Sequence, residues 1–579
     1  MAVIRFADFE LDLHSYELHE RGDPRKLQLQ PAKVLALLAM NPGRLVTREE
    51  IRKNLWGDDT FVDFEQSLNF CIRRIRAVLG DDAEQPRFIE TLPRRGYRFM
   101  ACVSRISEEE LPSVRRPIRL AVIPLEEFGT GAKQDYFGAG LAEEVVSILS
   151  RLNPEQLRVV STRIRGARQH ARMDLPRLRR ELNIDYALTG SVRRSDGRIR
   201  IAVQLLDLSD GGLLRSETYE REAKDLFTVQ EELAKQIAQW FAIELVPSTT
   251  LVQQKHVPTP AAHDAYLKAR FFWHKMTGES IRLSMRYFQE ATAADPHFAA
   301  PYAGLADCYA QMGSLRVALM KPSEALANAQ PLLRRALELN ESLAEAHCTL
   351  GMLKSWYELD WRGAGAEFQR ALQGDANNIT ALIWYALYLS AIGQPQDALR
   401  TITRARELDP LSAVVNTYVG VIYLHLGQLD FALRQLLQAI EFDPYYYRLH
   451  MFLGKVFSRL GRRSEAIESY KKALQRNPES LEALAFLACE FAMAGQRGSA
   501  LELLHKVRAT EDYFEPSLLC AAICSALGDA NEAFGWLERA LQNQAGPLYL
   551  VRIDDAFRSL RSDPRYRWFL ERIGLPPAS

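Results

Sequence analysis

A spacing of 34 residues runs through the second half of the chain. Glycine and alanine both recur at this interval: Gly393, Gly427, Gly461, Gly495, Ala398, Ala432, Ala466 and Ala500. Asp409, Asp443 and Asn477 keep the same period, and a proline follows each of them. Small residues at a fixed interval suit two antiparallel helices that cross closely, and proline ends the second helix. One helix pair cannot bury its apolar face alone, so this half is expected to stack into an all-α solenoid.

The period is that of the tetratricopeptide repeat (TPR), and the segment resembles this family. Further units fit around four more positions, Phe288, Gly313, Phe368 and Gly528. Together they give about eight repeats over residues 262–545, with an insertion near 315–324 and an irregular third unit around Trp356–Trp361. Residues 546–579 are expected to cap the array with a polar outer face. The resemblance implies a concave surface that binds peptides or proteins.

Aromatic side chains are frequent in the repeats, and their role is open at this stage. They include Trp384, Tyr385, Tyr388 and Tyr445–Tyr447. Such residues pack between helices more often than they line a ligand surface, so each is interpreted first as packing.

Residues 1–103 show a different pattern. The stretch VIRFADFELDLHSYELH alternates apolar and polar residues and predicts short antiparallel strands. A helix is expected from Pro31, and Thr47 with Glu50 forms a capping box that opens the next helix. A third helix runs from Asp63 to Leu79, before FIETL and YRFMACV form a hairpin. This order predicts an α+β winged helix-turn-helix.

The third helix has two faces. Its apolar stripe, expected to be the core face, consists of Leu68, Ile72, Ile75 and Leu79. The opposite face carries Gln66, Phe70, Arg73, Arg74 and Ala77, with Asn69 and Arg76 beside it. Arginine pairs with guanine through two hydrogen bonds and an apolar ring contacts the thymine methyl group, so this face suits a major groove. A merely solvated basic face is the alternative.

The hairpin favours the nucleic-acid interpretation. Arg94 and Arg95 lie at its tip before Gly96, where a wing would meet a backbone or a minor groove. Tyr97 and Phe99 are expected to pack the hairpin onto the domain. Arg94, Arg95 and Arg98 lie together in the hairpin, although the whole chain has no net charge, because a phosphate-lined groove would contact only this part of the surface.

Three blocks of this segment resemble the OmpR/PhoB-type DNA-binding domain, above all the branch of CadC-, ToxR- and HilA-type regulators. The blocks are LVTREEIRKNLWG, SLNFCIRRIRAVLGDD and PRFIETLPRRGYRF. The resemblance implies that the third helix reads the major groove through Phe70, Arg73 and Arg74, and that Arg98 is the wing arginine. Because the domain begins at residue 1, no receiver domain is expected ahead of it, and the input signal should enter elsewhere.

Residues 118–245 predict an α/β domain, with charged or Pro-rich linkers expected at 104–117 and 246–261. The phrases LAVIPL, YFGAGLAEEVVSILSRL and ALTGSVRRSDGRIRIAVQLLD resemble the TolB amino-terminal-like domain, which implies sensing or assembly but names no chemistry. The glycines of Gly129–Lys133 lack the spacing of a phosphate-binding loop.

Composition argues against several classes of protein. The chain has 73 basic and 73 acidic residues, seven cysteines and no apolar run of the length of a membrane span. We therefore expect a cytoplasmic protein with no membrane partner. No catalytic motif, metal-ligand spacing or cofactor motif occurs, and Cys520 and Cys524 fit buried thiols better than a metal pair.

The fold class expected is therefore multidomain: a winged helix-turn-helix, an α/β middle domain and a TPR α-solenoid. The function expected is a soluble one-component transcriptional regulator, not an enzyme. It would bind double-stranded DNA, as a homo-oligomer in one arrangement, and bind a protein through the concave TPR surface, with RNA polymerase as one candidate. The alternative is a TPR scaffold that DNA merely tethers, and reporter assays would separate the two.

Overall fold

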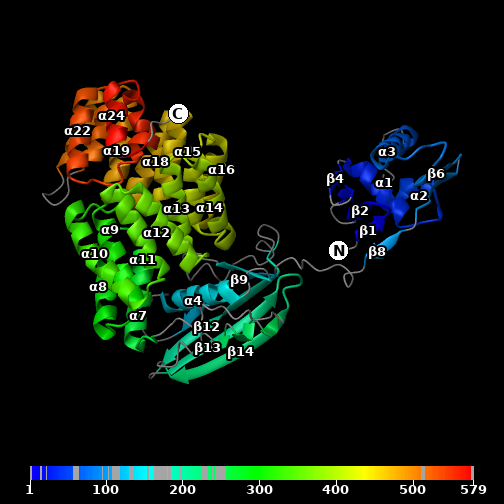
Figure 1. Ribbon diagram of the computed structural model, residues 1–579, viewed down its shortest axis with the longest axis horizontal. Coiled ribbons are helices and arrows are strands. Elements are labelled where there is room, and N and C mark those ends of the chain that lie inside the picture. Colours follow the sequence, from blue (N-terminus) through cyan, green and yellow to red (C-terminus); the bar gives the residue numbers. More distant parts are fainter. Residues whose placement is uncertain are drawn as a thin grey trace. The chain divides into compact units, whose positions relative to one another are not determined.

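The computed structural model divides the chain into two compact units, Met1–Arg116 and Pro117–Ser579 (Figure 1). Apart from isolated positions between 179 and 241, it describes residues 3–12, 16–20, 23–25, 27–55, 64–93, 95–101, 103–106, 118–128, 136–152, 156–161, 184–195, 198–222, 256–509 and 516–575. Some sequence predictions lie outside these residues. They concern Asp63 at the start of the third helix, Arg94, Gly129–Lys133 and most of the linkers predicted at 104–117 and 246–261.

The first unit opens with a sheet of short antiparallel strands, as the alternation predicts. Its strands are β1 (Val3–Phe6), β2 (Phe9–Asp12), β3 (Leu18–Glu20) and β4 (Asp23–Arg25), and β8 (Ser104–Ile106) completes it in the order β4-β3-β2-β1-β8. Strand β8 was not expected, because residues 104–117 were predicted to be linker. Ile106 pairs with Val3, so residues 104–106 belong to the domain.

Three helices follow the sheet, and a hairpin closes the domain. The elements are α1 (Leu29–Ala39), β5 (Leu45–Thr47), α2 (Arg48–Leu55), α3 (Phe64–Leu79), β6 (Ile89–Leu92) and β7 (Gly96–Phe99). The capping box forms, since the Glu50 amide donates to Thr47 Oγ1 over 3.1 Å and the Thr47 amide donates to Glu50 Oε2 over 3.4 Å. Gly80, at φ +64°, ends α3.

The middle domain is a mixed sheet with a helix on one face. The strands run in the order β11 (Leu157–Ser161), β9 (Ile118–Val122), β12 (Tyr186–Ser195), β13 (Arg198–Asp207) and β14 (Leu213–Glu222). Strand β10 (Glu126–Phe128) pairs with β12, and α4 (Tyr136–Leu152) buries Leu141, Val145 and Leu149. The α/β prediction agrees with this arrangement.

Eight antiparallel helix pairs are present among the residues described after 256. They are α7 (Pro260–Trp273) with α8 (Gly278–Ala294), α9 (Ala299–Met312) with α10 (Pro322–Leu339), α11 (Ala344–Leu353) with α12 (Trp361–Gly374), α13 (Ile379–Ala391) with α14 (Pro395–Leu408), α15 (Ala413–His425) with α16 (Leu429–Phe442), α17 (Tyr447–Arg459) with α18 (Arg463–Arg476), α19 (Leu481–Met493) with α20 (Arg497–Arg508) and α21 (Ser517–Ala526) with α22 (Ala530–Gln542).

The periodic residues occupy the positions that their chemistry predicts. The four periodic glycines have φ between +74° and +87° at the turn inside each pair, a conformation that favours glycine. The four periodic alanines are fully buried. Asp443 ends α16, where its Oδ1 accepts from the Tyr445 amide over 2.9 Å. The 34-residue period thus encodes the turn, the crossing and the end of each pair.

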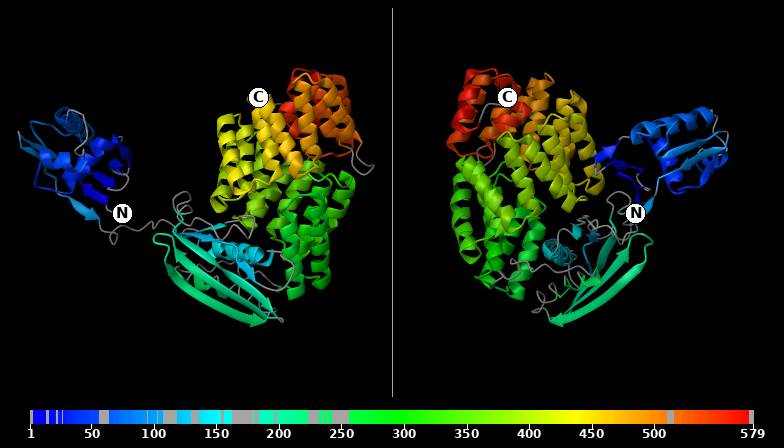
Figure 2. Two further views of the ribbon diagram at one scale, coloured as in Figure 1. Left: turned by 180° about the vertical axis from the view of Figure 1, so that it is seen from behind. Right: turned by 45° about the vertical axis from the view of Figure 1, so that its right-hand side comes forward.

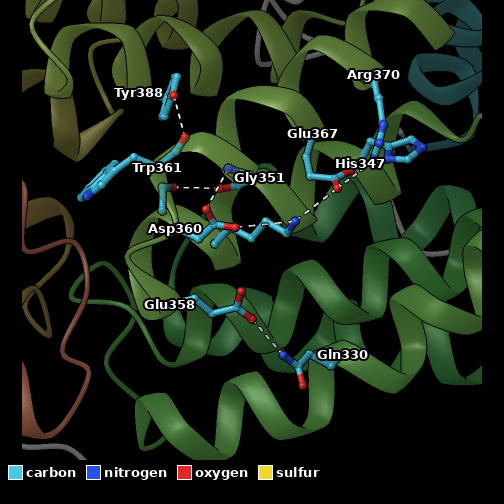
Figure 3. Close-up of polar contacts among 12 residues, drawn as sticks. Gln330, His347, Gly351, Glu358, Asp360, Trp361, Glu367, Arg370 and Tyr388 are labelled. Carbon is cyan, nitrogen blue, oxygen red and sulfur yellow. Dashed lines mark hydrogen bonds and ion pairs between the residues drawn. The ribbon is translucent and has the colours of Figure 1, made fainter. Parts of the chain in front are cut away.

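The third repeat is irregular, as its sequence indicates. A π-helical turn, Lys354–Glu358, follows α11, and Leu359 then adopts a left-handed conformation at φ +55°. Polar contacts hold this turn in place (Figure 3): Glu367 accepts from His347 Nδ1 over 2.7 Å, and Glu358 accepts from Gln330 over 2.9 Å. The Tyr388 hydroxyl donates to the Trp361 carbonyl over 2.7 Å. The π-helical turn of the third repeat is therefore held in one conformation.

The middle domain and the repeats share one core. Helix α4 lies between the sheet and α7 (Figures 1 and 2), and Gly140 is so close to Leu267 that a Cβ would clash with it. His263 Nε2 on α7 lies 2.6 Å from Glu144 Oε1 on α4, and His263 is 1% exposed. Leu411, between α14 and α15, packs with the other side of the sheet. A buried interface therefore joins the two domains on either side of the linker predicted at 246–261.

Candidate nucleic-acid interface and repeat groove

Helix α3 presents a polar face to solvent because its other face forms the core of the winged helix. Leu68, Ile72, Ile75 and Leu79 are buried against the aromatic residues of the sheets. On the opposite side Gln66, Asn69, Arg73, Arg74 and Ala77 are exposed. Phe70 is 49% exposed, which is unusual for a large apolar side chain. The structure therefore places these six residues on one accessible face, as predicted.

Arg73 and Arg74 differ from most arginines of this unit. Among the described residues, neither forms an ion pair or a side-chain hydrogen bond, whereas Arg44 pairs with Glu50 and Arg5 with Glu10. An exposed guanidinium with no partner keeps all of its donors for a ligand. Two such groups next to an exposed phenyl ring match the hydrogen-bonding and apolar features of base edges in a major groove.

A polar network that the sequence did not reveal orients Asn69. The buried Tyr97 hydroxyl donates to Asn69 Oδ1 over 3.1 Å and accepts from Arg48 Nη2 over 3.1 Å. Arg48 also pairs with Glu65. Burial raises the pKa of Tyr97, so its hydroxyl stays protonated and keeps donating. Because its side-chain oxygen already accepts this hydrogen bond, Asn69 presents its side-chain NH2 group as a donor. The residues come from α2, α3 and β7, and no sequence spacing links them.

Arg76 corrects the sequence prediction. It was placed beside the DNA-reading face, but its guanidinium turns into the domain and is only 15% exposed. Its Nη2 donates to the Ile89 carbonyl over 2.7 Å and to Thr91 Oγ1 over 2.9 Å. Two residues past Arg74, the turn of the helix brings Arg76 to the side that faces β6. Arg76 therefore positions the hairpin against α3.

The wing is built around Gly96. A Cβ at this position would collide with the carbonyl oxygen of Val46, so only glycine lets β7 approach β5. Arg95 is exposed at the turn. Arg98 on β7 is half-buried and donates to Glu90 Oε2 on β6 over 3.0 Å, so a neighbouring carboxylate offsets its charge. Of the two predicted wing arginines that the structure describes, Arg95 is exposed and Arg98 is not.

The first helices of four successive repeats, α13, α15, α17 and α19, carry an aromatic ladder. Trp384, Tyr418, Phe452 and Phe486 keep the 34-residue spacing and are buried. Ring centroids lie 6.2 Å apart from Trp384 to Tyr418 and again from Tyr418 to Phe452. Arg316, from the insertion in the second repeat, lies 4.3 Å from the Trp384 ring centroid and donates to the Tyr418 hydroxyl over 2.7 Å. We call this surface of α13, α15, α17 and α19 the inner groove.

Residues 545–575, which we call the C-terminal strap, reach into the inner groove. The strap contains α23 (Leu550–Ile553), a 3-10 turn (Asp555–Leu560) and α24 (Pro564–Arg572). Arg552 Nη1 donates to the Ala391 carbonyl over 2.7 Å, and Asp554 pairs with Lys455 on α17. The concave surface was predicted to be the open partner site, but the chain itself fills part of it.

Comparisons with known proteins divide the chain as the fold does. Residues 22–99 match the family model "Transcriptional regulatory protein, C terminal". Residues 117–237, which resemble the TolB amino-terminal-like domain in sequence, match "HilA/YgeH-like transcriptional regulator, second domain". Residues 447–480 match "Tetratricopeptide repeat". The chain combines an OmpR/PhoB-type domain, a HilA-like second domain and tetratricopeptide repeats.

Several curated relatives are similar over part or most of the chain. Transcriptional regulator HilA of Salmonella typhi is 24% identical over 429 residues, 72% of this chain and 73% of the relative. A protein named as adenylate cyclase 3 of Rhizobium meliloti is 28% identical over 252 residues, and the chain spans 42% of that relative. PhoB of Rhizobium meliloti is 31% identical over 97 residues, 16% of this chain and 41% of PhoB. Two of these relatives are named as transcriptional regulators, and the third is named as an adenylate cyclase.

Solved structures and local geometry add little about function. The TPR protein YrrB, titled as having an unusual peptide-binding site, is 26% identical, covers 34% of this chain and 95% of its own, and has a TM-score of 0.23. A TM-score this low supports no further argument. Among the described residues, no helix is long and apolar enough to cross a membrane, and no cluster of potential ligands could hold a metal ion.

Proposed function

We propose that this protein regulates transcription, without enzymatic activity, by binding promoter DNA through α3 and the wing. The observation that supports this most is the pair of exposed arginines, Arg73 and Arg74, beside the exposed Phe70. In the proposed complex α3 lies in the major groove, its arginines contact guanine edges, and Phe70 contacts a thymine methyl group. Gln66 and Asn69 add hydrogen bonds to bases or phosphates.

The wing supplies the contacts that do not depend on sequence. Arg94 and Arg95 flank the Gly96 turn, and their charges suit a phosphate backbone or a narrow minor groove. Arg98 contributes less, because Glu90 is its partner. Arg76 is left out of the contact set, since its donors are used within the domain.

Unit Pro117–Ser579 is the proposed input module. The repeats provide a large surface for a protein partner, of which RNA polymerase is one candidate, and the middle domain is fixed to the first repeat. Coupling between partner and DNA requires that the partner favour one state of the whole chain. The alternative function, a scaffold that DNA only tethers, needs the same DNA contacts but no effect on transcription.

DNA binding is tested first with Met1–Arg116, which forms its own compact unit and keeps β8. We expect it to select a defined sequence from a random pool, and the double variant Arg73→Ala/Arg74→Ala to lose that selection. Arg5→Ala is the matched control, because Arg5 is an exposed arginine on β1 that already pairs with Glu10. Selection that survives in the double variant would contradict the proposed reading face.

A reporter assay then separates regulator from tether. Full-length protein should change transcription from a promoter that carries the selected site, and Met1–Arg116 should occupy the site without giving the regulated output. Occupancy by the full chain with no change in transcription would favour the scaffold. Steep binding to paired sites would indicate a homo-oligomer on DNA.

A further inference from the structure

The C-terminal strap spans the repeats that a partner would use. It begins at the third repeat, where Gly546 lies so close to the Trp356 carbonyl that a Cβ would clash. It returns there at its end, where Trp361 Nε1 donates to the Ile573 carbonyl over 2.6 Å. The irregular turn of the third repeat is therefore the place where both ends of the strap dock.

The middle of the strap buries Val551, Phe557 and Leu560 in the core of the repeats, and it also contacts α17 through charge. Asp554 pairs with Lys455, and Asp555 Oδ2 lies 2.7 Å from Arg459 Nε. Lys455 and Arg459 are four residues apart on α17, so both reach the same side of this helix. Ser559 Oγ lies 2.7 Å from Ser525 Oγ on α21. Two adjacent carboxylates thus meet two cations of the inner groove.

We propose that the inner groove is a docking site for an acidic protein segment, and that residues 548–560 of the strap occupy it until such a partner takes their place. The strap shows which ligand the groove accepts: two neighbouring carboxylates for Lys455 and Arg459, followed by an apolar side chain in the place of the buried Phe557. This inference rests on the proposed role of the repeats in binding a partner.

Residues 548–560 carry two aspartates and two arginines, so the exchange would replace one pair of adjacent carboxylates by another. Desolvation offsets much of the attraction in a buried ion pair, so Asp554 and Asp555 select a ligand more than they hold it. Tethering gives the strap an effective concentration in the millimolar range, and a partner at micromolar concentration must overcome this advantage. The tether therefore keeps weak acidic peptides out and admits a partner that binds elsewhere as well.

A labelled synthetic peptide that copies residues 548–562 tests the proposal on the full-length protein. The wild-type protein should bind it weakly, because the strap occupies the groove. Asp554→Ala/Asp555→Ala weakens the strap, so the peptide should bind at least about tenfold more tightly. Adding Lys455→Ala/Arg459→Ala should abolish this gain, and a peptide with both aspartates replaced by asparagine should not bind.

Controls and contrary outcomes are distinct. Glu468→Ala removes an exposed carboxylate of α18 that pairs only with Lys472, and it should leave peptide binding at the wild-type level. Equal binding of the aspartate and asparagine peptides would overturn the acidic specificity.

Hydrogen exchange on the wild-type protein covers the case of a variant that does not fold. Residues 548–562 should exchange faster than α15 and α17. Equally slow exchange would show that the strap is a permanent part of the core. DNA selection by Met1–Arg116 does not involve this groove, so the two proposals fail separately.

Discussion

The cations of α3 and those of α17 show how similar side chains serve opposite purposes. Arg73 and Arg74 on α3 are exposed and, among the described residues, without a partner. On α17, Arg448 pairs with Glu482, Lys455 with Asp554 and Arg459 with Asp555. A cation without a partner in the chain is available to an external anion, whereas a paired cation already has its ligand. In the functions proposed above, the first surface would bind DNA as it stands, and the second would bind a partner only after the strap has left it.

The largest difference between the two helices is expected in stability, when a buried ion pair of α17 loses one partner. Arg448 and Glu482 have side chains 3% and 9% exposed, and their atoms Nη1 and Oε2 lie 2.6 Å apart. Glu482→Ala leaves a guanidinium buried without a counter-charge, which should cost about 3–5 kcal/mol of unfolding free energy. Chemical denaturation of the full chain measures it. Arg448→Met/Glu482→Leu should recover most of the loss, and a double variant as unstable as the single one would contradict this account.

A pH series probes the same groove through His425. Burial, followed by the nearby charge of Lys455, lowers the pKa of His425 from 6.5 to about 4. The unfolded chain therefore takes up the proton at a higher pH than the folded chain. Stability should be complete above pH 6.5 and fall as the pH drops toward 4, by roughly 2–3 kcal/mol for this group.

Four groups face His425 and three of them carry charge, so the measurement must be a difference. They are Ser390, whose Oγ lies 2.9 Å from His425 Nδ1, together with Lys455, Arg459 and Asp554. His425→Gln should remove the loss of stability between pH 6.5 and 4 while leaving the steeper loss at lower pH, where the carboxylates are protonated. Identical pH profiles for the two proteins would mean that His425 does not titrate in this way.

On the α3 surface the expected effect is on binding, not on stability. Arg74→Ala should cost ~1–3 kcal/mol on the selected DNA sequence and relax the preference at one base pair. The melting temperature should stay at the wild-type value, because Arg74 has no partner within the described residues. Fluorescence anisotropy with selected and scrambled duplexes gives the ratio, and an unchanged ratio would contradict a base contact.

The wing should give the smallest change, spread over all sequences. Arg94→Ala/Arg95→Ala should reduce the slope of log affinity against log salt by ~1–2, because each arginine releases about one counterion. Arg98→Ala should change the slope less, since Glu90 already offsets its charge. A salt titration of the three proteins tests this order, and a larger effect for Arg98 would reverse the assignment of the wing contacts.

Local patterns predicted the elements of both regions well. The apolar stripe of α3, the capping box at Thr47 and the turn glycines of the repeats each depend on residues within a few turns of one another. Such features follow from helical geometry and from glycine's access to positive φ, so the sequence shows them directly. The exposed face of α3 was predictable for the same reason, except for Arg76.

Arg76 shows where local reasoning ends. Its place on the helical wheel lies beside the outer face, and only the position of β6 decides that its donors turn inward to Ile89 and Thr91. Asn69 is similar, since its orientation depends on Tyr97, 28 residues away. A helix pattern states which face a residue is on, but not which neighbour from another element reaches it.

Sequence patterns alone predicted the winged helix, the repeat period and the number of repeats, because these depend on contacts between neighbouring elements. Only the tertiary structure decided that the middle domain shares a core with the repeats and that the strap occupies the inner groove. The contacts responsible join residues far apart, as when Trp361 binds Ile573, 212 positions away. They form because small rotations between successive repeats add up until distant repeats face the same space, and no local pattern records that sum.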